Sequence, residues 1–479
     1  MTVDSPTTEP EITRSSRVGT AMLWALSVGA SVGGIFSGWN PGLAQAGFGG
    51  MLVATLVAIM LYLFLVMSIA ELAVMMPFAG GTVNYARTAF GVWGGFLAAI
   101  SALIAYTFAM TSLMGIMTTE VTRILVELNG PNIPAPVLWA VFLLGFGWLN
   151  LKDRRTFFIA ALVLALVTLA VLFVTAIAVV PSFEPAALLS IPANLNGNEW
   201  LPHGLLGIAF AIPFAMWFFL SIEVVSYAAE DALTPDKSVP RSLLMALLTL
   251  AVCALIILTV LSGAKPGALM IAKATDPLST SLEVVFGKMS LLYLVPLIGA
   301  VAGFHSVIYS ASRVVFSLSR SGYLPSGLST IADNRGTPVK AGISVCVVVY
   351  AISCLTLFAP ANVKIVEMLI NMAAIGGLLT YIFVFASYVK LHASYPKLER
   401  PFTSTFGGTG AIAGLMMTAV GLLLMVVYAQ HLSALLGCLG VFLVAIVLFF
   451  IFRPKHLRAD SPDEIYARAL QNKSSSLTE

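Results

Sequence analysis

Long apolar runs constrain the fold of this chain more than any other feature of its sequence. A helix of about 20 apolar residues is long enough to cross a bilayer, and runs of this kind follow one another near residues 19–46, 50–76, 95–127, 136–151, 156–180, 204–232, 241–264, 286–318, 340–358, 364–390, 409–430 and 433–453. Only 10% of the 479 residues are charged, whereas a soluble domain carries about 25%. The sequence therefore predicts an all-α integral membrane protein with twelve transmembrane helices.

Basic residues are distributed unevenly between the loops of this predicted topology. If the N-terminus lies in the cytoplasm, the inner segments hold most of them, among others Arg87, Lys152, Arg154, Arg155, Lys237, Arg241, Arg320, Lys340 and Lys390. Few fall on the outer side, such as Arg123, Lys265, Lys273 and Lys288. Basic loops stay inside, so we expect a multi-pass protein of the cytoplasmic (inner) membrane. Its tails, residues 1–18 and 454–479, are expected to be cytoplasmic.

Two of the predicted helices are interrupted. The first holds GASVGGIFSGWNPG, residues 29–42, in which five glycines and a proline crowd one apolar segment. The second holds Glu223 in the middle of an apolar run, although a carboxylate there costs roughly 2.5–3.5 kcal/mol to insert. Paired broken helices are typical of transporters built from inverted repeats, whose binding site lies at the repeat interface. We therefore expect helices 1–5 (19–180) and helices 6–10 (204–390) to form a 5+5 inverted repeat, followed by two extra helices (409–453).

Four candidate residues can each be interpreted in two ways. Glu223 is expected to pair with a substrate ammonium or to carry a proton, and the alternative is a structural hydrogen bond to unwound backbone. His305, in the middle of helix 8, titrates near physiological pH and is a candidate for coupling; alternatively it is a satisfied core residue. Gly33 and Gly34 would present free backbone groups to a ligand, or else permit close helix packing.

Aromatic residues flank the same interrupted segments. Trp217 and Phe218 precede the break of helix 6, and Tyr106 lies on helix 3. Aromatic faces attract ammonium groups and bulky rings can close a site against water, although most membrane aromatics serve packing. Ser221, between these aromatics and Glu223, is a further candidate for substrate contact.

Four stretches resemble the amino acid–polyamine–organocation (APC) transporter superfamily. They are GGIF at 33–36, PFAGGTVNYARTAFG at 77–91, AAEDALTPDKSVPRS at 228–242 and SASRVVFSLSRSGYLP at 310–325. The resemblance implies a leucine-transporter-like fold with helices 1 and 6 broken and with helices 1, 6 and 8 around the site. It also implies that Trp217 acts as a gate, and it favours coupling or gating over specificity for Glu223.

Within the superfamily the chain is most similar to ethanolamine permeases. The similar stretches are FSGWNPGL at 36–43, SIAEL at 68–72, IPFAMWFFLSIE at 212–223 and FHSVIYSASR at 304–313. Where that branch has acidic residues in helices 1 and 3, this chain has Ile35 and Ala105. These departures favour a small or apolar monoamine, or a zwitterion held by the glycines of helix 1.

The sequence thus predicts a secondary active transporter that imports a small amine or amino acid by alternating access. Protons are the expected coupling ion, while the serines of helix 8 (Ser306, Ser310 and Ser312) leave sodium as an alternative. An exchanger, a sodium symporter and a transport-inactive membrane sensor are the competing interpretations. We expect no enzyme activity, since the sequence holds no HExxH motif and no clustered set of His and Cys residues. No cofactor, metal or nucleic acid is expected, only the substrate and the lipid bilayer.

Overall fold

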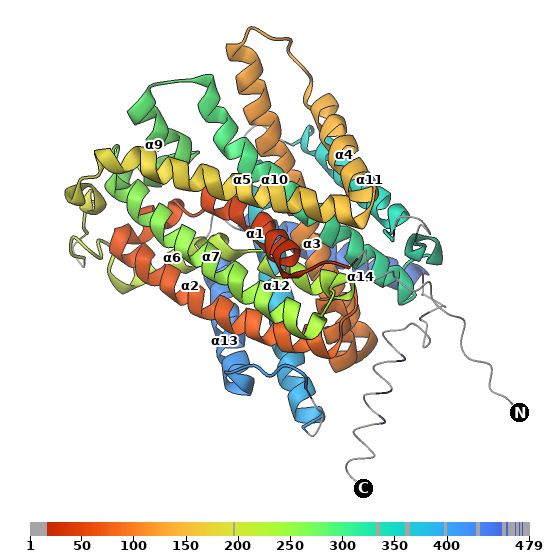
Figure 1. The fold of residues 1–479 in the computed structure, drawn as a ribbon. Coiled ribbons are helices and arrows are strands. Elements are labelled where there is room, and N and C mark those ends of the chain that lie inside the picture. The colour runs from red at the N-terminus through yellow and green to blue at the C-terminus, as the bar shows by residue number, and fades with distance from the viewer. Residues whose placement is uncertain are drawn as a thin grey trace, which may run out of the picture.

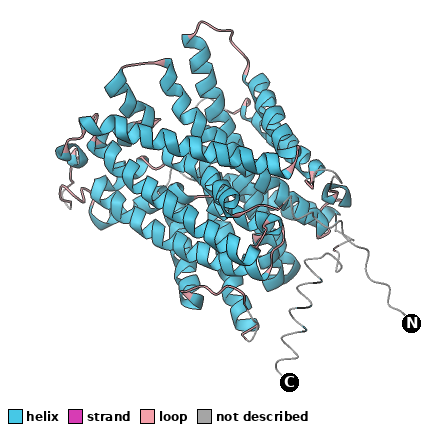
Figure 2. Ribbon diagram, viewed as in Figure 1, coloured by secondary structure: helices cyan, strands magenta, loops and turns pink. Residues whose placement is uncertain are grey.

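The computed structural model describes residues 17–194, 197–331, 336–359, 365–396, 400–427 and 432–452, with four isolated residues beyond. The predicted tails, 1–18 and 454–479, lie outside the described residues except for Arg17, Val18 and those isolated positions. Helices joined by loops make up the described chain (Figure 2).

Each predicted run contains a helix, although the second and third helices begin well before the predicted positions 50 and 95. In chain order they are α1 (Thr20–Phe36), α2 (Pro41–Met75), α3 (Thr82–Glu127), α4 (Ala135–Leu151), α5 (Arg154–Val179), α6 (Gly204–Met216), α7 (Pro235–Gly263), α8 (Ala268–Lys273), α9 (Pro277–Phe286), α10 (Leu294–Arg320), α11 (Val339–Thr356), α12 (Ile365–Ser394), α13 (Gly407–Val427) and α14 (Leu432–Phe452). Short 3-10 helices lie between them, namely η2 (Val180–Ser182), η3 (Pro185–Leu189), η4 (Trp217–Phe219), η5 (Ile222–Asp231), η6 (Ser290–Tyr293) and η7 (Ser326–Ser329).

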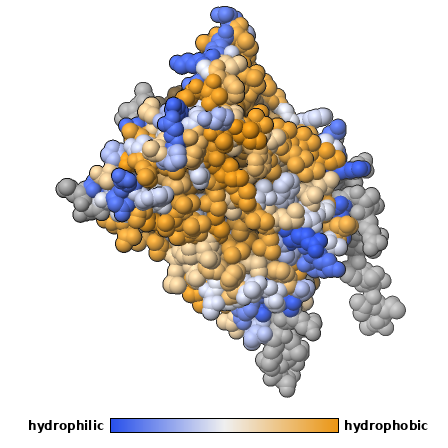
Figure 3. Space-filling model, turned by 60° about the vertical axis from the view of Figure 1, so that its left-hand side comes forward, coloured by the Kyte–Doolittle hydropathy of each residue, from blue (hydrophilic) through white to orange (hydrophobic). Residues whose placement is uncertain are grey.

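Ten segments of the described chain are long and apolar enough to cross a membrane, by length and composition. The shorter apolar helices α1 and α4, of 17 residues each, occupy the first and fourth predicted spans but fall outside this set. Apolar residues cover much of the surface seen in Figure 3, and hydrophilic residues gather toward its margins. The count of twelve spans and the inverted repeat stay predictions.

The break near the start of the chain divides the first predicted span. That span was expected to run over 19–46, but α1 ends at Phe36 and α2 already begins at Pro41. Gly38, with φ of +94°, and Pro41, which has no N–H, explain why the helix cannot continue. Gly47, with φ of +69°, then kinks α2 where the second span was expected to begin. The interruption is therefore confirmed, one turn later than the GGIF stretch.

The second predicted break lies where helix 6 unwinds. The α-helical part of α6 stops at Met216, η4 follows, and Ser221 adopts a left-handed conformation with φ of +74°. A residue with a side chain adopts this conformation only when its surroundings hold it there. The chain continues as η5, so the predicted span is split into two parts that meet at Leu220 and Ser221.

Helix α1 lies at the centre of the bundle. It packs against α5, α7 and α10 and against the two halves of the broken helix, η4 and η5. Figure 1 shows α5, α7 and α2 running side by side along the molecule, and α13 beside α12 at its periphery. Because α1 and η4 both end in the middle of this bundle, the two breaks come face to face.

Candidate functional site

A cavity of about 70 Å³ lies where the two breaks meet. Helices α1, α3, α10 and α12 and the helix 6 break line it, with Ala30, Ser31, Gly33, Gly34, Ser37, Gly38, Ala105, Ala109, Ser112, Leu113, Ile116, Trp217, Leu220, Ser221, Gly303, Val307, Ile370, Ala373 and Gly377. Four of the predicted site residues, Gly33, Gly34, Trp217 and Ser221, are therefore brought together. The other four, Tyr106, Phe218, Glu223 and His305, lie outside this lining.

The walls of the cavity are small and mostly apolar. No charged side chain of the described residues lines it. Its polar side chains are serines: the hydroxyl of Ser112 donates to the carbonyl of Ala109 (2.9 Å), whereas the buried hydroxyl of Ser31 has no partner among the described residues. A polar ligand here would meet hydroxyls and backbone groups, not ionised side chains.

Gly33 and Gly34 both belong to the last turn of α1. The carbonyl of Gly33 accepts a hydrogen bond from the backbone N–H of Ser37 (3.2 Å), and a Cβ at Gly33 would lie 3.7 Å from the Gly299 carbonyl oxygen. A Cβ at Gly34 would lie 1.8 Å from the carbonyl oxygen of Trp217. Gly34 is thus required for the close approach of α1 to η4. At Gly33, by contrast, a methyl side chain would fit without a clash.

Trp217 and Phe218 point to different surroundings. The indole ring of Trp217 lies against Gly38, with Cδ2 3.6 Å from the position that a Cβ would occupy, so it covers the loop between α1 and α2 at the edge of the cavity. Phe218 is fully buried and packs on Trp39, with 5.5 Å between ring centroids. Trp217 is therefore the aromatic ring placed to contact a bound molecule.

Glu223 lies behind the break and is held by two tyrosines. Its carboxylate accepts hydrogen bonds from the hydroxyls of Tyr106 (2.7 Å) and Tyr381 (2.8 Å), and it is 1% exposed. The backbone N–H of Ser221 donates to the same Tyr381 hydroxyl (3.1 Å). No cation of the described residues forms an ion pair with Glu223, and the Tyr381 hydroxyl links this buried carboxylate to Ser221 in the cavity wall.

His305 faces away from the cavity. Gly303 and Val307 of α10 line the cavity, and a residue midway between them lies on the opposite face of a helix. The ring of His305 stacks on Phe157 of α5 at 4.5 Å, and its Nε2–H donates to the Phe157 carbonyl (3.2 Å), which can only accept. The structure therefore does not bring His305 and Glu223 together.

A charged cluster closes one end of η5. The Asp231 carboxylate pairs with Arg154 (3.1 Å) and Arg313 (2.7 Å) and accepts a hydrogen bond from the Tyr309 hydroxyl (2.5 Å). The backbone of Asp231 also accepts from the N–H of Val18 (2.9 Å), so the beginning of α1 is tied to the same place. Four helical elements, α1, α5, η5 and α10, are thus fastened together at the end predicted to face the cytoplasm.

The serine hydroxyls of α10 differ in whether they form hydrogen bonds. The hydroxyl of Ser310 donates to the Ser306 carbonyl (3.4 Å) and that of Ser312 to the Ile308 carbonyl (2.7 Å), whereas the Ser306 hydroxyl has no partner among the described residues. No group of three or more His, Cys, Asp or Glu residues that could hold a metal ion occurs in the described part of the chain.

Two residues at or beside the site, Ser31 and Tyr381, were not predicted from the sequence. Ser31 lies three residues before Gly34, within one turn on the same face of α1, a spacing that could have marked it. Tyr381, by contrast, meets Glu223 across 158 residues of sequence, and no local pattern signals that contact.

These features define a class: a multi-pass helical membrane protein with a cavity at paired helix breaks. The amino acid permease family model matches residues 18–468. The chain belongs to this family, and it is a transporter and not an enzyme. The membership agrees with the predicted APC superfamily.

Three relatives match most of the chain at low sequence identity. An uncharacterized transporter of Rhizobium meliloti (strain 1021) is 27% identical over 456 residues, 93% of this chain and 94% of the relative. The branched-chain amino acid permease BcaP of Bacillus subtilis (strain 168) is 24% identical, covering 94% of this chain and 95% of its own length. The gamma-aminobutyric acid permease of Escherichia coli (strain K12) is 26% identical, covering 78% and 79% respectively.

Proposed function

We propose that this protein imports a small zwitterionic amino acid across the cytoplasmic membrane by alternating access, driven by protons. The cavity at the two helix breaks is the proposed binding site, with Gly33, Gly34, Trp217 and Ser221 in its wall. The observation that carries the proposal is the absence of charged side chains from the described lining. A monoamine or diamine would need a carboxylate there to balance its charge.

Helix ends supply the charges that a zwitterion needs. Helix α1 ends at Phe36, next to the lining residues Gly33, Gly34 and Ser37, and α2 begins at Pro41, three residues after the lining residue Gly38. The carbonyl end of a helix favours cations and the amide end favours anions. We therefore propose that the ammonium of a zwitterion lies near the carbonyl end of α1, with its carboxylate toward the start of α2. The named relatives include permeases for branched-chain amino acids and gamma-aminobutyric acid, which are zwitterions.

The lining also limits the size and the polarity of the substrate's side chain. Ala109, Leu113, Val307 and Ala373 form an apolar wall, and the cavity volume is about 70 Å³. Burial of apolar area stabilises a bound aliphatic group by about 25 cal/mol per Å². A small aliphatic side chain fits this wall better than a charged one.

We assign proton coupling to Glu223. Its carboxylate is buried, accepts hydrogen bonds from the hydroxyls of Tyr106 and Tyr381, has no ion-pair partner among the described residues, and is linked to the cavity through Tyr381 and the Ser221 N–H. A proton gained or lost there would change the hydrogen bonds at the break. Sodium remains the alternative, because the Ser306 hydroxyl lies beside α1, 2.7 Å from the position of a Cβ on Gly29.

Alternating access requires one end of the site to open while the other is shut. The Asp231 cluster would serve as the inner closure, since its salt bridges join α5, η5 and α10. This assignment rests on the predicted orientation with both termini in the cytoplasm. Trp217, over the loop between α1 and α2, would close the site from the other side.

The test is uptake into proteoliposomes that contain the full chain. Labelled valine is compared with isobutylamine, which has the same side chain and ammonium but no carboxylate. We expect valine uptake that increases with an inward proton gradient and is not inhibited by isobutylamine. The panel also includes gamma-aminobutyric acid, phenylalanine, putrescine and ethanolamine.

Each other outcome points to a different interpretation. Uptake of ethanolamine or isobutylamine in preference to valine would restore the ethanolamine permease branch and contradict the zwitterion. Uptake driven by sodium and indifferent to pH would overturn the role of Glu223. Uptake that requires a substrate inside the vesicle would indicate an exchanger, and no transport of any compound would favour a sensor.

A further inference from the structure

Buried hydroxyl groups continue from Glu223 toward the end of the protein that is predicted to face the cytoplasm. The hydroxyl of Tyr106 donates to the Glu223 carboxylate (2.7 Å). The ring of Tyr106 lies edge-on to that of Tyr227, with 5.7 Å between the ring centroids. The hydroxyls of Tyr106 and Thr82 both lie within interaction range of the Tyr227 hydroxyl. Tyr106, Tyr227 and Thr82 thus form a row of hydroxyl groups that begins at the buried carboxylate.

The row ends beside the turn between α2 and α3. A Cβ at Gly81 would lie 2.6 Å from the Ser226 hydroxyl, so a glycine is needed for this turn to approach η5 so closely. Asn84, two residues after Thr82, accepts a hydrogen bond from the Ser317 hydroxyl of α10 (3.2 Å). In the predicted orientation, with basic loops inside, this turn lies at the cytoplasmic face.

Five polar groups around this row form no hydrogen bond of regular geometry among the described residues. Their side chains are at most 3% exposed. They are the hydroxyls of Thr82, Tyr85, Ser226 and Tyr227 and the Nδ2 group of Asn84. Buried polar groups normally have partners, and bound water supplies them where the protein does not. A buried water molecule makes about three hydrogen bonds, so these groups are enough to hold one.

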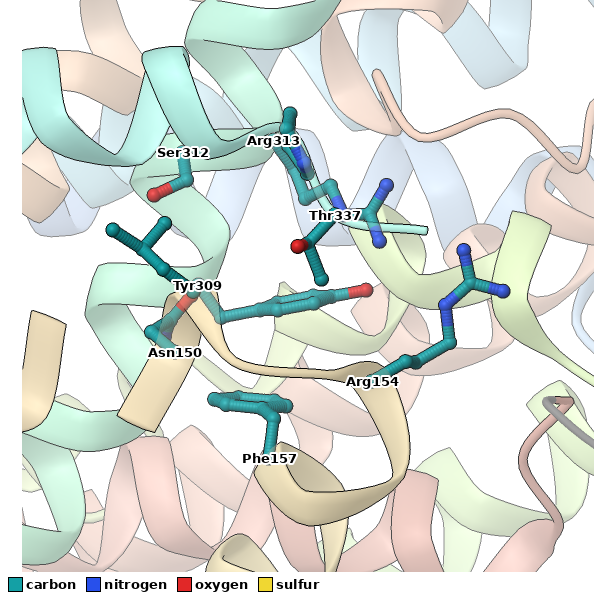
Figure 4. A pocket seen from close by; sticks show the side chains of 9 residues that line it. Asn150, Arg154, Phe157, Tyr309, Ser312, Arg313 and Thr337 are labelled. Carbon is teal, nitrogen blue, oxygen red and sulfur yellow. The ribbon is translucent and has the colours of Figure 1, made fainter. Parts of the chain in front are cut away.

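The Asp231 cluster, at the same end of η5, does not offer a proton a comparable path. Figure 4 shows the side chains of Arg154 and Arg313 near the hydroxyl end of the Tyr309 ring, and both arginines pair with Asp231. Arginine side chains are barriers to protons in transport pathways. The five groups beside the glycine turn include no charged side chain. A proton that leaves Glu223 along the row therefore meets hydroxyls, an amide and water.

The titratable groups of the described residues that face Glu223 are tyrosines. They are Tyr62 of α2, Tyr106 of α3, Tyr227 of η5 and Tyr381 of α12. Of the other helices packed against η5, α1 holds no titratable residue, and the charged residues of α7 are exposed at its start. Tyr309 and Arg313 of α10 face Asp231 instead. Among its neighbours, Glu223 is therefore the carboxylate that can start a proton transfer along the row.

We propose that Tyr106, Tyr227 and Thr82 conduct the coupling proton between Glu223 and the cytoplasm. This inference rests on the proposed function, in which Glu223 couples transport to protons. The protonated carboxyl donates to the Tyr106 oxygen, each hydroxyl passes its own proton onward as it receives one, and water beside Asn84 takes up the proton that leaves. Glu223 is then ionised and accepts the hydrogen bond from Tyr106 that the structure shows.

Hydroxyl-radical footprinting tests for the water in this route. Ionising radiation makes hydroxyl radicals from water, bound water included, and mass spectrometry of the purified full chain detects the side chains that they oxidise. Tyr227 and Tyr85 are expected to be oxidised although both are 0% exposed. Tyr62 is the control, since it is equally buried but its hydroxyl donates to the Met216 carbonyl (3.2 Å). If Tyr227 and Tyr85 stay as unmodified as Tyr62, the route holds no water and the inference is wrong.

Two variants test the conduction itself. Tyr227→Phe and Thr82→Val each remove one hydroxyl and keep the shape of the side chain. Valine uptake driven by a proton gradient should fall by roughly tenfold in each, less than the loss of a group that itself transfers a proton in a reaction, because neighbouring water remains. Valine counterflow at acidic pH, where Glu223 keeps its proton, should be unchanged.

Thr168→Val is the matched control for the threonine variant. Thr168 is also 0% exposed, but its hydroxyl donates to carbonyl groups of its own helix, α5. We expect this variant to change neither gradient-driven uptake nor counterflow.

The outcomes separate this inference from the proposed function. Gradient-driven uptake that is as fast in Tyr227→Phe and Thr82→Val as in the unsubstituted protein would overturn the route and leave Glu223 as the coupling group. Uptake and counterflow that fall together in both variants would show that these hydroxyls serve structure, which also overturns the route. Uptake by the unsubstituted protein that ignores the proton gradient would overturn the proposed coupling and the route with it.

Discussion

The hydroxyl of Tyr381 donates a hydrogen bond of 2.8 Å to the carboxylate of Glu223, although the two residues are 158 positions apart in the sequence. The same hydroxyl accepts the N–H of Ser221, the residue at the break of helix 6. A change at the carboxylate is therefore transmitted to the cavity wall through one tyrosine oxygen. This contact links Glu223 to the wall of the proposed substrate site, which the carboxylate itself does not line.

The variant Glu223→Gln tests that route. Glutamine keeps the shape of the side chain but cannot carry the proton, so we expect uptake to lose its increase with an inward proton gradient. Counterflow of valine, which needs no gradient, should continue. Uptake and counterflow in proteoliposomes measure the two properties separately. Gradient-driven uptake that survives in Glu223→Gln would show that the proton travels elsewhere.

Gly34 and Gly33 provide a matched pair of substitutions. A Cβ at Gly34 would lie 1.8 Å from a backbone oxygen, that of Trp217, whereas a Cβ at Gly33 would lie 3.7 Å from its neighbour. Gly34→Ala is expected to destabilise the protein by about 3 kcal/mol, the upper end for overpacking, and to abolish valine uptake. Gly33→Ala should fold as well as the unsubstituted protein, since alanine favours helix. Unfolding midpoints in detergent compare the two, and equal effects would contradict the close approach at Gly34.

His305 is expected to serve packing and not coupling. Its ring stacks on Phe157 and lies on the face of α10 opposite to the cavity. In His305→Phe, valine uptake should keep its dependence on the proton gradient, while the unfolding midpoint changes through the lost hydrogen bond, worth about 1 kcal/mol. Loss of the gradient dependence in this variant would instead support a role for His305 in proton coupling.

Asp231 is the carboxylate whose loss should cost the most stability. It is 1% exposed and compensates two buried arginines, so Asp231→Asn is expected to destabilise the protein by about 3–5 kcal/mol. The exposed pair of Lys265 and Glu184 is the control, with 58% exposure on each side. Glu184→Gln should change stability by less than about 1 kcal/mol. Thermal unfolding of both variants checks the contrast, which would fail if the two midpoints moved equally.

Asp276, in the loop between α8 and α9, gives a pH dependence of stability. Burial raises the pKa of Asp276 to about 6 from an ordinary value of 3.8, although Ser279 hydrogen bonds act in the opposite direction. Between these two values the folded state binds more protons than the unfolded state, so this group's contribution to stability falls as the pH rises from about 4 to 6. Asp276→Asn, which can still cap α9, should be less sensitive to pH over that range. Unfolding midpoints measured at pH 4.5 and 7 in both proteins test this, and identical pH profiles would contradict it.

Much of the architecture follows from local sequence. The apolar runs located the helices, because the bilayer forces each segment to satisfy its own backbone hydrogen bonds. Glycine and proline located the break after α1 to within a turn, and Glu223 in the middle of an apolar run marked helix 6 as interrupted. The family followed from motifs that lie within single segments.

The arrangement of the site was decided by the tertiary structure. Ala109, Ala373 and Gly377 line the cavity but carry no chemical signal in the sequence. The rotation of α10 in the bundle decides which of its faces meets α1. It therefore also decides that His305 does not line the cavity. The same holds for Tyr381, which finds Glu223 only when α12 packs beside α3.

The sequence alone thus determined where the apolar helices lie, where two of them break and to which family the chain belongs, because these depend on interactions within one segment. Only the tertiary structure decided which side chains share a cavity, which carboxylates meet hydroxyls and which meet arginines. Those pairings depend on distances between helices that are far apart in the chain, and no local pattern encodes them.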